Sequence, residues 1–324
     1  MRFRFSGPVL VVLLGSTTFA AEPVREVVTQ ALVAGPLPGF DHGYLYFVDH
    51  PSNYVRIFAP DGHLLSSFDP HPGGRATVSS IAVDPSGVIA SAITTAPAQC
   101  AVDLRSFDGT PIRSFNTGNY CYLGLAWDDD HSLWSFGAEF TPTGRRLSAE
   151  FMTVRRYSPD GQQMAAYLPR SQFPGDAMLT ACCLWQPKIS VAKDHIGVNA
   201  IAGSNGGILE WVELDLKGNI TGRWAIPSQG QQGLTPVLTS DGEAYMSRRV
   251  PEAKTIRTFK LNRATSTWDL METLPDGSVW GVDGVGLCRL VDTCHDFTVV
   301  YAPLVFSEQL AQNGCGGGIV TRLK

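Results

Sequence analysis

The chain repeats a short pattern of apolar and polar positions. An apolar extended stretch runs into a turn of the Pro-Asp-Gly type, and a second extended stretch then ends on an aromatic residue six positions after the glycine. The pattern occupies residues 54–68, 101–115, 153–167 and 210–224, with its glycines at Gly62, Gly109, Gly161 and Gly218. Two extended runs around a tight glycine-containing turn predict a β-hairpin, and their recurrence indicates an internal structural repeat.

A second pattern lies between these hairpins. An apolar strand enters an aspartate-rich turn and leaves it as another apolar strand, in segments that begin at Leu37, Ser80, Gly124, Ile189 and Pro236. Each pair of patterns makes a four-stranded antiparallel unit, and strands that are apolar on both faces suit sheets stacked on one another. The sequence therefore predicts an all-β fold, a six-bladed β-propeller of four-stranded antiparallel blades.

The number of blades depends on how the ring closes. Residues 256–268 form a fifth hairpin that has lost its glycine, and a degraded sixth unit begins at Ser278. If residues 24–33 supply the outer strand of the last blade, the chain closes its own ring and six blades fit. Seven blades would require residues 297–323 to make most of a further unit. We expect six.

The first twenty residues have the features of a signal peptide. Two arginines precede a short apolar core, and small residues at Thr18 and Ala20 predict cleavage after Ala20. The apolar run is shorter than the roughly 20 residues that cross a bilayer, and no later segment is expected to span one. The predicted organisation is a signal peptide at 1–20 and a single β-propeller domain at 21–324, in a periplasmic or secreted protein.

Composition and charge narrow the class of protein. The chain has 33 glycines, 21 prolines, 44% hydrophobic and 17% charged residues, which fits a turn-rich globular β-protein and not a coiled coil or a disordered chain. Its net charge of -5 and the lack of a Lys/Arg run give no attraction for nucleic acid, so we expect no nucleic-acid partner.

Seven cysteines in an exported chain indicate disulfides and one remaining thiol. Cys100 and Cys121 bracket the second hairpin, and Cys288 and Cys294 flank a five-residue segment, so both pairs are predicted bridges if their Cα atoms come within about 7 Å. Cys315 has two candidate partners in the adjacent Cys182 and Cys183, which could instead bond to each other. There is no Cys-x-x-Cys and no paired histidine spacing, so we expect neither a metal site nor a cofactor.

The phrases AVDPSG at 82–87, VRIFAPDG at 55–62 and VRRYSPDG at 154–161 resemble NHL-type six-bladed propellers. The group is similar to the calcium-dependent lactonases of the SMP-30 and gluconolactonase kind. That resemblance implies a calcium-ligand glutamate in a Glu-Gly-Pro motif, where this chain has Ala34-Gly35-Pro36, and alanine cannot bind calcium. The resemblance therefore predicts the fold and leaves enzymatic activity uncertain, with a binding role favoured.

The predicted fold separates two kinds of connection. The glycine turns and the aspartate-rich turns are expected on one face of the ring, where Asp128 to Asp130 would accept local backbone hydrogen bonds. The other connections are longer and more varied, which is typical of binding loops on a rigid scaffold. There we expect Arg75, Arg145, Arg170 and Arg248 to converge around one mouth of the central channel.

These residues define a candidate ligand-binding set: His50, Arg75, Tyr120, Arg145, Arg170 and Arg248. Guanidinium groups gathered together, with stacking or hydrogen-bonding groups beside them, favour an anionic ligand. The predicted function is a binding scaffold for a small anionic or polar ligand or for a protein partner. The alternative is a lactonase-like hydrolase or lyase with its site at the channel mouth.

Overall fold

The structure is a computed structural model of the 324-residue chain. It describes residues 27–34, 39–41, 44–49, 54–58, 64–72, 74, 76–96, 98–144, 149–173, 189–201, 209–226, 236–238, 242–250, 255–275, 298–304 and 317–323. The signal-peptide prediction falls outside these ranges. Within them, no helix has the length and apolar character needed to cross a membrane.

Four sheets have the same construction. Each contains four antiparallel strands that pair in the order of the sequence. The first is β6 (Thr77–Asp84), β7 (Val88–Ala96), β8 (Gln99–Ser106) and β9 (Pro111–Gly118). The second is β10 (Tyr120–Trp127), β11 (Leu133–Glu139), β12 (Met152–Tyr157) and β13 (Gln163–Pro169). The third is β14 (Ile189–Ala192), β15 (His195–Ile201), β16 (Leu209–Asp215) and β17 (Ile220–Ile226). The fourth is β18 (Val237–Leu238), β19 (Ala244–Val250), β20 (Thr255–Asn262) and β21 (Thr267–Pro275).

A seven-stranded sheet joins the two ends of the fold. Its strands are β1 (Val27–Ala34), β2 (Gly39–Asp41), β3 (Tyr44–Asp49), β4 (Tyr54–Phe58), β5 (Leu64–Phe68), β22 (Thr298–Leu304) and β23 (Gly317–Leu323). β1 pairs antiparallel with β23, from Val27 opposite Leu323 to Ala34 opposite Gly317. An early strand thus pairs with the C-terminal part of the chain. It is not the outer strand of its sheet, however, because Val33 of β1 also pairs with Asp49 of β3.

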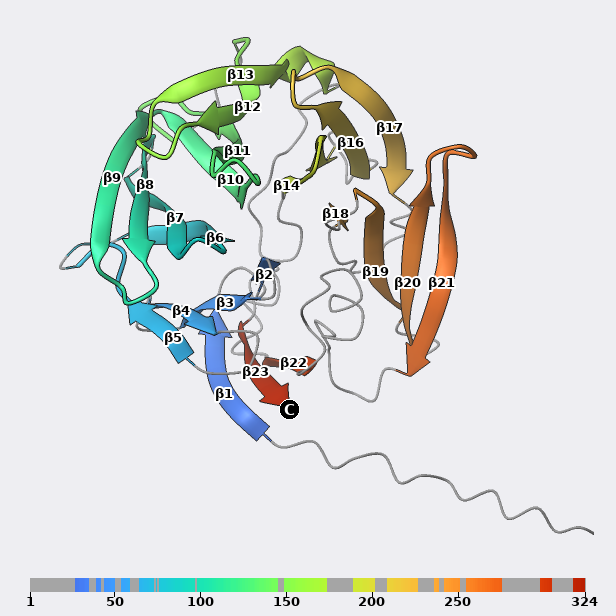
Figure 1. Cartoon of the computed structure of the whole chain (residues 1–324), viewed down its shortest axis with the longest axis horizontal. Helices are drawn as coiled ribbons and strands as arrows, with labels where there is room; N and C mark the ends of the chain where they lie inside the picture. Colours follow the sequence, from blue (N-terminus) through green and yellow to red (C-terminus); the bar gives the residue numbers. More distant parts are fainter. Residues whose placement is uncertain are drawn as a thin grey trace, which may run out of the picture.

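The sheets are arranged around a central axis (Figure 1). Their first strands, β6, β10, β14 and β18, lie toward the axis, and their last strands, β9, β13, β17 and β21, form the perimeter. A ring of radially arranged four-stranded sheets is a β-propeller, so the predicted fold class is confirmed. The count of six blades also involves residues 276–297, which lie outside the described residues, and the NHL assignment remains a prediction.

The repeated hairpin pattern has a structural cause. The four aromatic residues occupy the same register, because Phe68, Phe115, Tyr167 and Trp224 on the outer strands pair with Val55, Val102, Val154 and Trp211. Phe68 and Trp224 are buried, and Phe115 and Tyr167 are half-buried. The four positions are therefore structurally equivalent, as the repeated pattern predicts, although two of them are less buried than the other two.

Three of the four aromatics cover the turn glycine of the next sheet: Phe68 lies against Gly109, Phe115 against Gly161 and Tyr167 against Gly218. Gly161 and Gly218 have φ of +85° and +84°, a conformation that glycine adopts without strain. A Cβ built on Gly161 would lie 2.6 Å from Cδ1 of Phe115, and one on Gly218 would lie 2.0 Å from Cδ1 of Tyr167. The glycine is thus required both by the turn and by the ring packed against it.

Apolar side chains fill the spaces between neighbouring sheets. Trp134 and Trp211 are fully buried in two of these layers, as expected for aromatic residues of the strand patterns. Hydrogen bonds also join successive inner strands: Leu125 N donates to Ser80 Oγ at 2.9 Å, and Leu238 N donates to Ser190 Oγ at 3.0 Å. The sheets form a rigid frame on which the connections are held.

Candidate functional site

The ring has two faces with different connections. Phe107 N, in the turn between β8 and β9, donates to Gly87 O, in the turn between β6 and β7, at 3.1 Å. The two kinds of short turn therefore share one face, as predicted, and we call it the turn face. The opposite face, called the loop face, carries the connections between second and third strands and between sheets. Among the described residues these include 118–120, 139–144, 149–152 and 169–173.

Tyr120 anchors a polar cluster at the loop face. Its side chain is 0% exposed, and its hydroxyl donates to Thr153 O at 2.8 Å and lies 3.1 Å from Ser135 Oγ. Burial raises the pKa of the Tyr120 hydroxyl, so this group stays protonated and acts as a donor. A Cβ on Gly137 would fall 2.8 Å from Cζ of Tyr120, so only glycine leaves room for the ring.

Arg155 lies on top of this ring. Its Cζ is 3.8 Å from the centroid of Tyr120, and Nη2 donates to the carboxylate of Glu139 at the loop-face end of β11. Asn119 Nδ2 approaches the other carboxylate oxygen at 3.5 Å. A guanidinium held by stacking and by one carboxylate has a fixed orientation. We refer to Asn119, Tyr120, Glu139 and Arg155 as the Arg155 cluster.

The Arg155 cluster is partly open to solvent. The side chains of Arg155 and Glu139 are 14% and 22% exposed, and Asn119 is exposed. Nε of Arg155 is buried and has no hydrogen-bond partner among the described residues. The cluster thus combines a fixed cation, an amide and a single carboxylate, which are groups that can bind an anionic or polar ligand.

A second charged cluster lies on the outer part of the same face. The 3-10 helix η1 (Arg170–Gln172) follows β13, and Arg170 N donates to Phe151 O at 2.9 Å. Arg223 lies over the ring of Phe173 at 5.6 Å and donates to Glu210 Oε2 at 3.2 Å. These contacts connect two neighbouring sheets and place Arg170, half-buried, beside them.

The predicted site residues have different outcomes. Tyr120 differs from the expectation of a ligand-contacting group, because it is fully buried and supports Arg155 from below. Arg248 lies within β19, opposite Arg257, and not in a loop; its side chain is outside what the structure describes. His50, Arg75 and Arg145 also fall outside the described residues. Convergence of the arginines at one channel mouth therefore remains a prediction.

Arg155 is the residue that the sequence reasoning missed. It belongs to the VRRY phrase, whose alternation places Val154 and Arg156 on one side of β12 and Arg155 on the other. Two adjacent arginines, Arg155 and Arg156, within the third strand of the sheet were the available signal. Glu139 comes from β11 and Asn119 from the turn between β9 and β10, and the pairing depends on register that the pattern alone does not fix.

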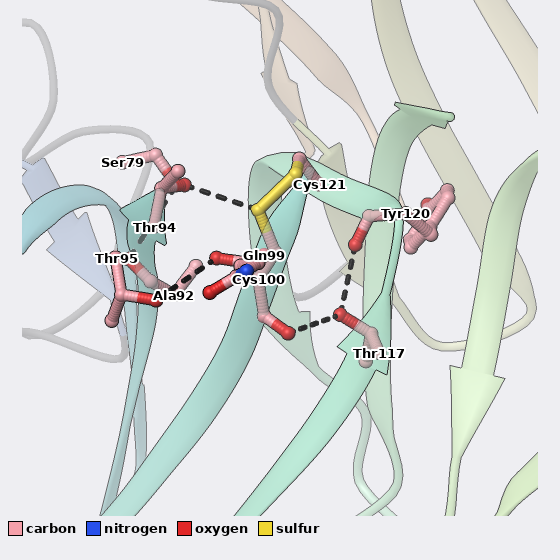
Figure 2. Close-up of a disulfide and its surroundings, with 9 residues drawn as sticks. All are labelled: Ser79, Ala92, Thr94, Thr95, Gln99, Cys100, Thr117, Tyr120 and Cys121. Atoms are coloured by element: carbon pink, nitrogen blue, oxygen red, sulfur yellow. Dashed lines mark hydrogen bonds between the residues drawn. A yellow bond between two sulfur atoms is a disulfide. The ribbon is translucent and has the colours of Figure 1, made fainter. Parts of the chain in front are cut away.

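The predicted Cys100–Cys121 disulfide is confirmed. The Cα atoms of the two residues are 5.2 Å apart, and the bridge joins the start of β8 to β10 of the next sheet (Figure 2). Both cysteines are buried. The predicted Cys288–Cys294 bridge and the alternatives for Cys182, Cys183 and Cys315 concern residues that the structure does not describe.

Aspartates on the turn face have the predicted local role. Asp128 Oδ1 accepts from Asp130 N at 3.0 Å and Ser132 N at 2.7 Å. Its Oδ2 accepts from Trp134 Nε1 at 2.8 Å and from Arg156 Nη2 at 3.0 Å. The aspartate closes its turn with one oxygen and holds a neighbouring strand with the other.

An aspartate–histidine pair also lies on the turn face. Asp84 Oδ2 is 2.7 Å from His131 Nδ1, and Oδ1 accepts from Ser86 N at 2.9 Å. The carboxylate side chain is 2% exposed and the imidazole is 56% exposed, so Nε2 of His131 is the ring nitrogen left for other contacts. Among the described residues, no group of three or more His, Cys, Asp or Glu is arranged to hold a metal ion.

Comparison with known proteins supports the fold. No protein-family model and no curated protein matches the sequence. A luciferin-regenerating enzyme of known structure is similar at 12% identity, with a TM-score of 0.52 over 93% of this chain and 95% of the other. A catalytically inactive virginiamycin B lyase from Staphylococcus aureus is similar at 12% identity, with a TM-score of 0.45 over 91% and 97%. The Dos1 propeller has 11% identity and a TM-score of 0.41 over 87% and 75%. At 12% identity, the likeness to the luciferin-regenerating enzyme shows a shared fold and not a shared activity.

Proposed function

We propose that this protein is an exported, periplasmic or secreted, six-bladed propeller of the NHL type that acts as a binding scaffold for an anionic or polar ligand. The observation that carries the proposal is the Arg155 cluster at the loop face. Its cation is held in place before any ligand arrives, stacked at 3.8 Å on a buried tyrosine. Preorganisation of this kind reduces the entropy lost on binding.

The charge balance of the cluster favours an anion that competes with Glu139. In the structure, the carboxylate of Glu139 occupies one edge of the Arg155 guanidinium. A carboxylate or phosphate group of a ligand offers the same oxygens and can use the second edge or replace Glu139. Asn119, exposed beside it, supplies an amide that both donates and accepts.

Two substitutions with opposite expected effects test this function. Titration calorimetry would compare binding of inorganic phosphate, citrate and an acidic peptide to the wild-type protein and its variants. Arg155→Gln should weaken the binding of any of these that the wild-type protein takes, and Glu139→Gln should strengthen it, each by on the order of ten-fold, because one removes the cation and the other its competitor.

The matched control is Arg113→Ala, which removes an exposed arginine of β9 whose Nη1 donates to Asp160 O at 3.0 Å, away from the cluster. It should leave the affinity unchanged. If Arg155→Gln and Arg113→Ala weaken ligand binding equally, the effect comes from general surface charge and not from the Arg155 cluster. Absence of binding by all three probes, together with no anionic molecule found by mass spectrometry in the purified protein, would end the proposal.

The hydrolase or lyase alternative has one observation in its favour, and that observation is on the turn face. The buried Asp84 carboxylate orients His131 so that Nε2 faces solvent, an arrangement that suits a general base. An ester or lactone substrate panel tests it: turnover that is lost in both His131→Gln and Asp84→Asn supports an enzyme. Turnover that persists in both variants removes the assignment to this pair.

A further inference from the structure

The disulfide lies directly beside the Arg155 cluster. Cys121 is the neighbour of Tyr120 at the start of β10, and its partner Cys100 is near the start of β8 in the preceding sheet (Figure 2). Between the two cysteines the chain runs through the whole of β9 and then turns into β10 at Gly118 and Asn119. The bridge therefore holds together the connection from β9 to β10 at residues 117–121, which we call the corner and on which the Arg155 cluster is built.

A hydroxyl group reinforces the same corner. Thr117 Oγ1 lies 3.1 Å from Cys100 O and 2.8 Å from Tyr120 O, as Figure 2 shows, so it links the two cysteine-bearing strands. Gly118 follows with a φ of +67°, which allows the abrupt turn. The positions of Asn119 and Tyr120 are thus determined by the disulfide, by Thr117 and by a glycine turn.

The position of Tyr120 in turn determines that of Arg155. The tyrosine ring is the surface on which the guanidinium lies, and its hydroxyl is fixed by Thr153 O on β12. A shift of the corner would displace the ring, and with it one wall of the arginine site. The contacts thus form a continuous path from the disulfide through the corner to the ring of Tyr120, and from that ring to the guanidinium of Arg155.

We propose that formation of the Cys100–Cys121 disulfide assembles the Arg155 cluster, so that the loop-face site becomes competent only in an oxidising compartment. As a statement about ligand binding this rests on the proposed function; as a statement about the geometry of the cluster it does not. The step is an ordinary exchange: the two thiols give two electrons and two protons to a disulfide oxidant, which is reduced to two thiols as the bridge forms. Before export, in a reducing environment, the corner would remain open.

Hydrogen exchange of the full chain tests the coupling without a ligand. We compare the oxidised wild type with the Cys100→Ser/Cys121→Ser double variant, which leaves no reactive thiol at either position. Amides of residues 118–122 and 139–140 should exchange on the order of ten-fold faster in the variant, whereas those of the β14–β17 sheet should change little. The wild type refolded with reduced or with oxidised glutathione should show the same difference.

A control separates local coupling from general loss of stability. Val212→Ala removes buried side-chain volume in β16, outside the core cluster that holds both cysteines, and lowers global stability. At a denaturant concentration that gives both variants the same unfolded fraction, accelerated exchange at the corner should appear only in the cysteine variant. Uniform acceleration in both variants would overturn the proposal, because the bridge would then act only on the whole fold.

A second variant tests the same coupling if the double cysteine variant does not fold. Thr117→Val keeps the disulfide and removes the hydroxyl between Cys100 O and Tyr120 O. It should accelerate exchange at residues 118–122 by a smaller factor, and unchanged exchange there would also overturn the proposal. In either variant, a loosened corner with unaltered phosphate, citrate and peptide binding would keep the geometric coupling and overturn the claim that the corner makes the site competent. Absence of binding by the oxidised wild type would instead reject the proposed function and leave the coupling intact.

Discussion

The ring of Phe115 lies against Gly161 of the next sheet, where a Cβ would come within 2.6 Å of Cδ1. The same relationship joins Tyr167 to Gly218 one sheet further along. A recurring contact between an aromatic and a turn glycine explains why the two are spaced as they are in the sequence. The spacing between glycine and aromatic is measured within one hairpin, but the aromatic packs against the turn glycine of the hairpin in the next sheet.

Truncation of this ring should measure the strength of the junction between sheets. Phe115→Ala should lower the free energy of unfolding by about 2 to 3 kcal/mol, since the aromatic is half-buried and leaves a cavity between sheets. Urea denaturation gives the value. Ile112→Ala is the control on the same strand, where the side chain is 53% exposed, and it should cost less than about 0.5 kcal/mol. Equal costs for the two would contradict the repeat contact.

Acid should weaken the turn face. Hydrogen bonds from Ser106 and then from Thr110 lower the pKa of Asp108 to about 2. Similar bonds, chiefly from Ser158, from Asn219 and from Asn262, lower the pKa of three further carboxyls: Asp160, Asp215 and Asp269. A carboxyl whose pKa is depressed in the folded state contributes stability above its unfolded value, and this contribution is lost as the pH falls through the folded value.

The window for Asp108 extends from its ordinary pKa of 3.8 down to about 2. The melting temperature should therefore decrease as the pH is lowered through this range, and the decrease should be smaller in Asp108→Asn. Burial raises the pKa of Asp103, so protonation of that group acts in the opposite direction and favours the fold as the pH falls. A variant that melts with the wild-type pH dependence would show that the turn carboxyl contributes nothing.

The ion pair between Glu213 and Arg263 should be a strong link between the β14–β17 and β18–β21 sheets. Glu213 is 1% exposed and accepts from Arg263 Nε at 2.8 Å and Nη2 at 2.9 Å, and also from Trp211 Nε1. Arg263→Ala leaves a buried carboxylate without its cation and should cost about 2 kcal/mol, less than a fully buried pair because the arginine is 30% exposed.

Neutralising the carboxylate should restore part of that loss. The double variant Arg263→Ala/Glu213→Gln keeps an acceptor for Trp211 and removes the unpaired charge, so it should be more stable than Arg263→Ala alone. Chemical denaturation of the four proteins of this double-mutant cycle measures the coupling. Additive effects would show that the two residues do not act as a pair.

Non-reducing peptide mapping of the purified protein should recover Cys288 and Cys294 in one linked fragment. The Cys100–Cys121 fragment is the internal reference in the same digest. The intact mass should also show loss of the first twenty residues, as cleavage after Ala20 predicts. Free alkylation of Cys288 and Cys294 beside an intact Cys100–Cys121 bridge would reject the second disulfide alone.

The sequence was most informative where the pattern is local. Hairpin strands, the turn glycines Gly109, Gly161 and Gly218, and the Cys100–Cys121 pair follow from residues close to one another along the chain. Within the described residues each is found as expected. Tyr120 was misplaced because its neighbours Gly118 and Asn119 suggest an exposed loop, whereas the connection is so short that the tyrosine already begins β10.

Arg155 could not be assigned a role from the pattern alone. Its contacts are with Tyr120, 35 positions earlier, and with Glu139 on the neighbouring strand, and both depend on the register of three strands. Alternation along β12 shows that the side chain of Arg155 is on the opposite face from Val154. It does not show which residues lie next to it on that face. The role of a charged side chain inside a sheet thus depends on its tertiary contacts, which the sequence pattern does not specify.

The pairing of β1 with β23 has a consequence for how the ring forms and fails. Every other sheet joins strands that follow one another, so these sheets can form from local hairpins, whereas Val27 meets Leu323 only after almost the entire chain has been made. The seam between the first and last strands is therefore expected to close last and slowest in refolding. The entropic cost of closing so long a loop makes this seam the natural place for the ring to open under heat or force.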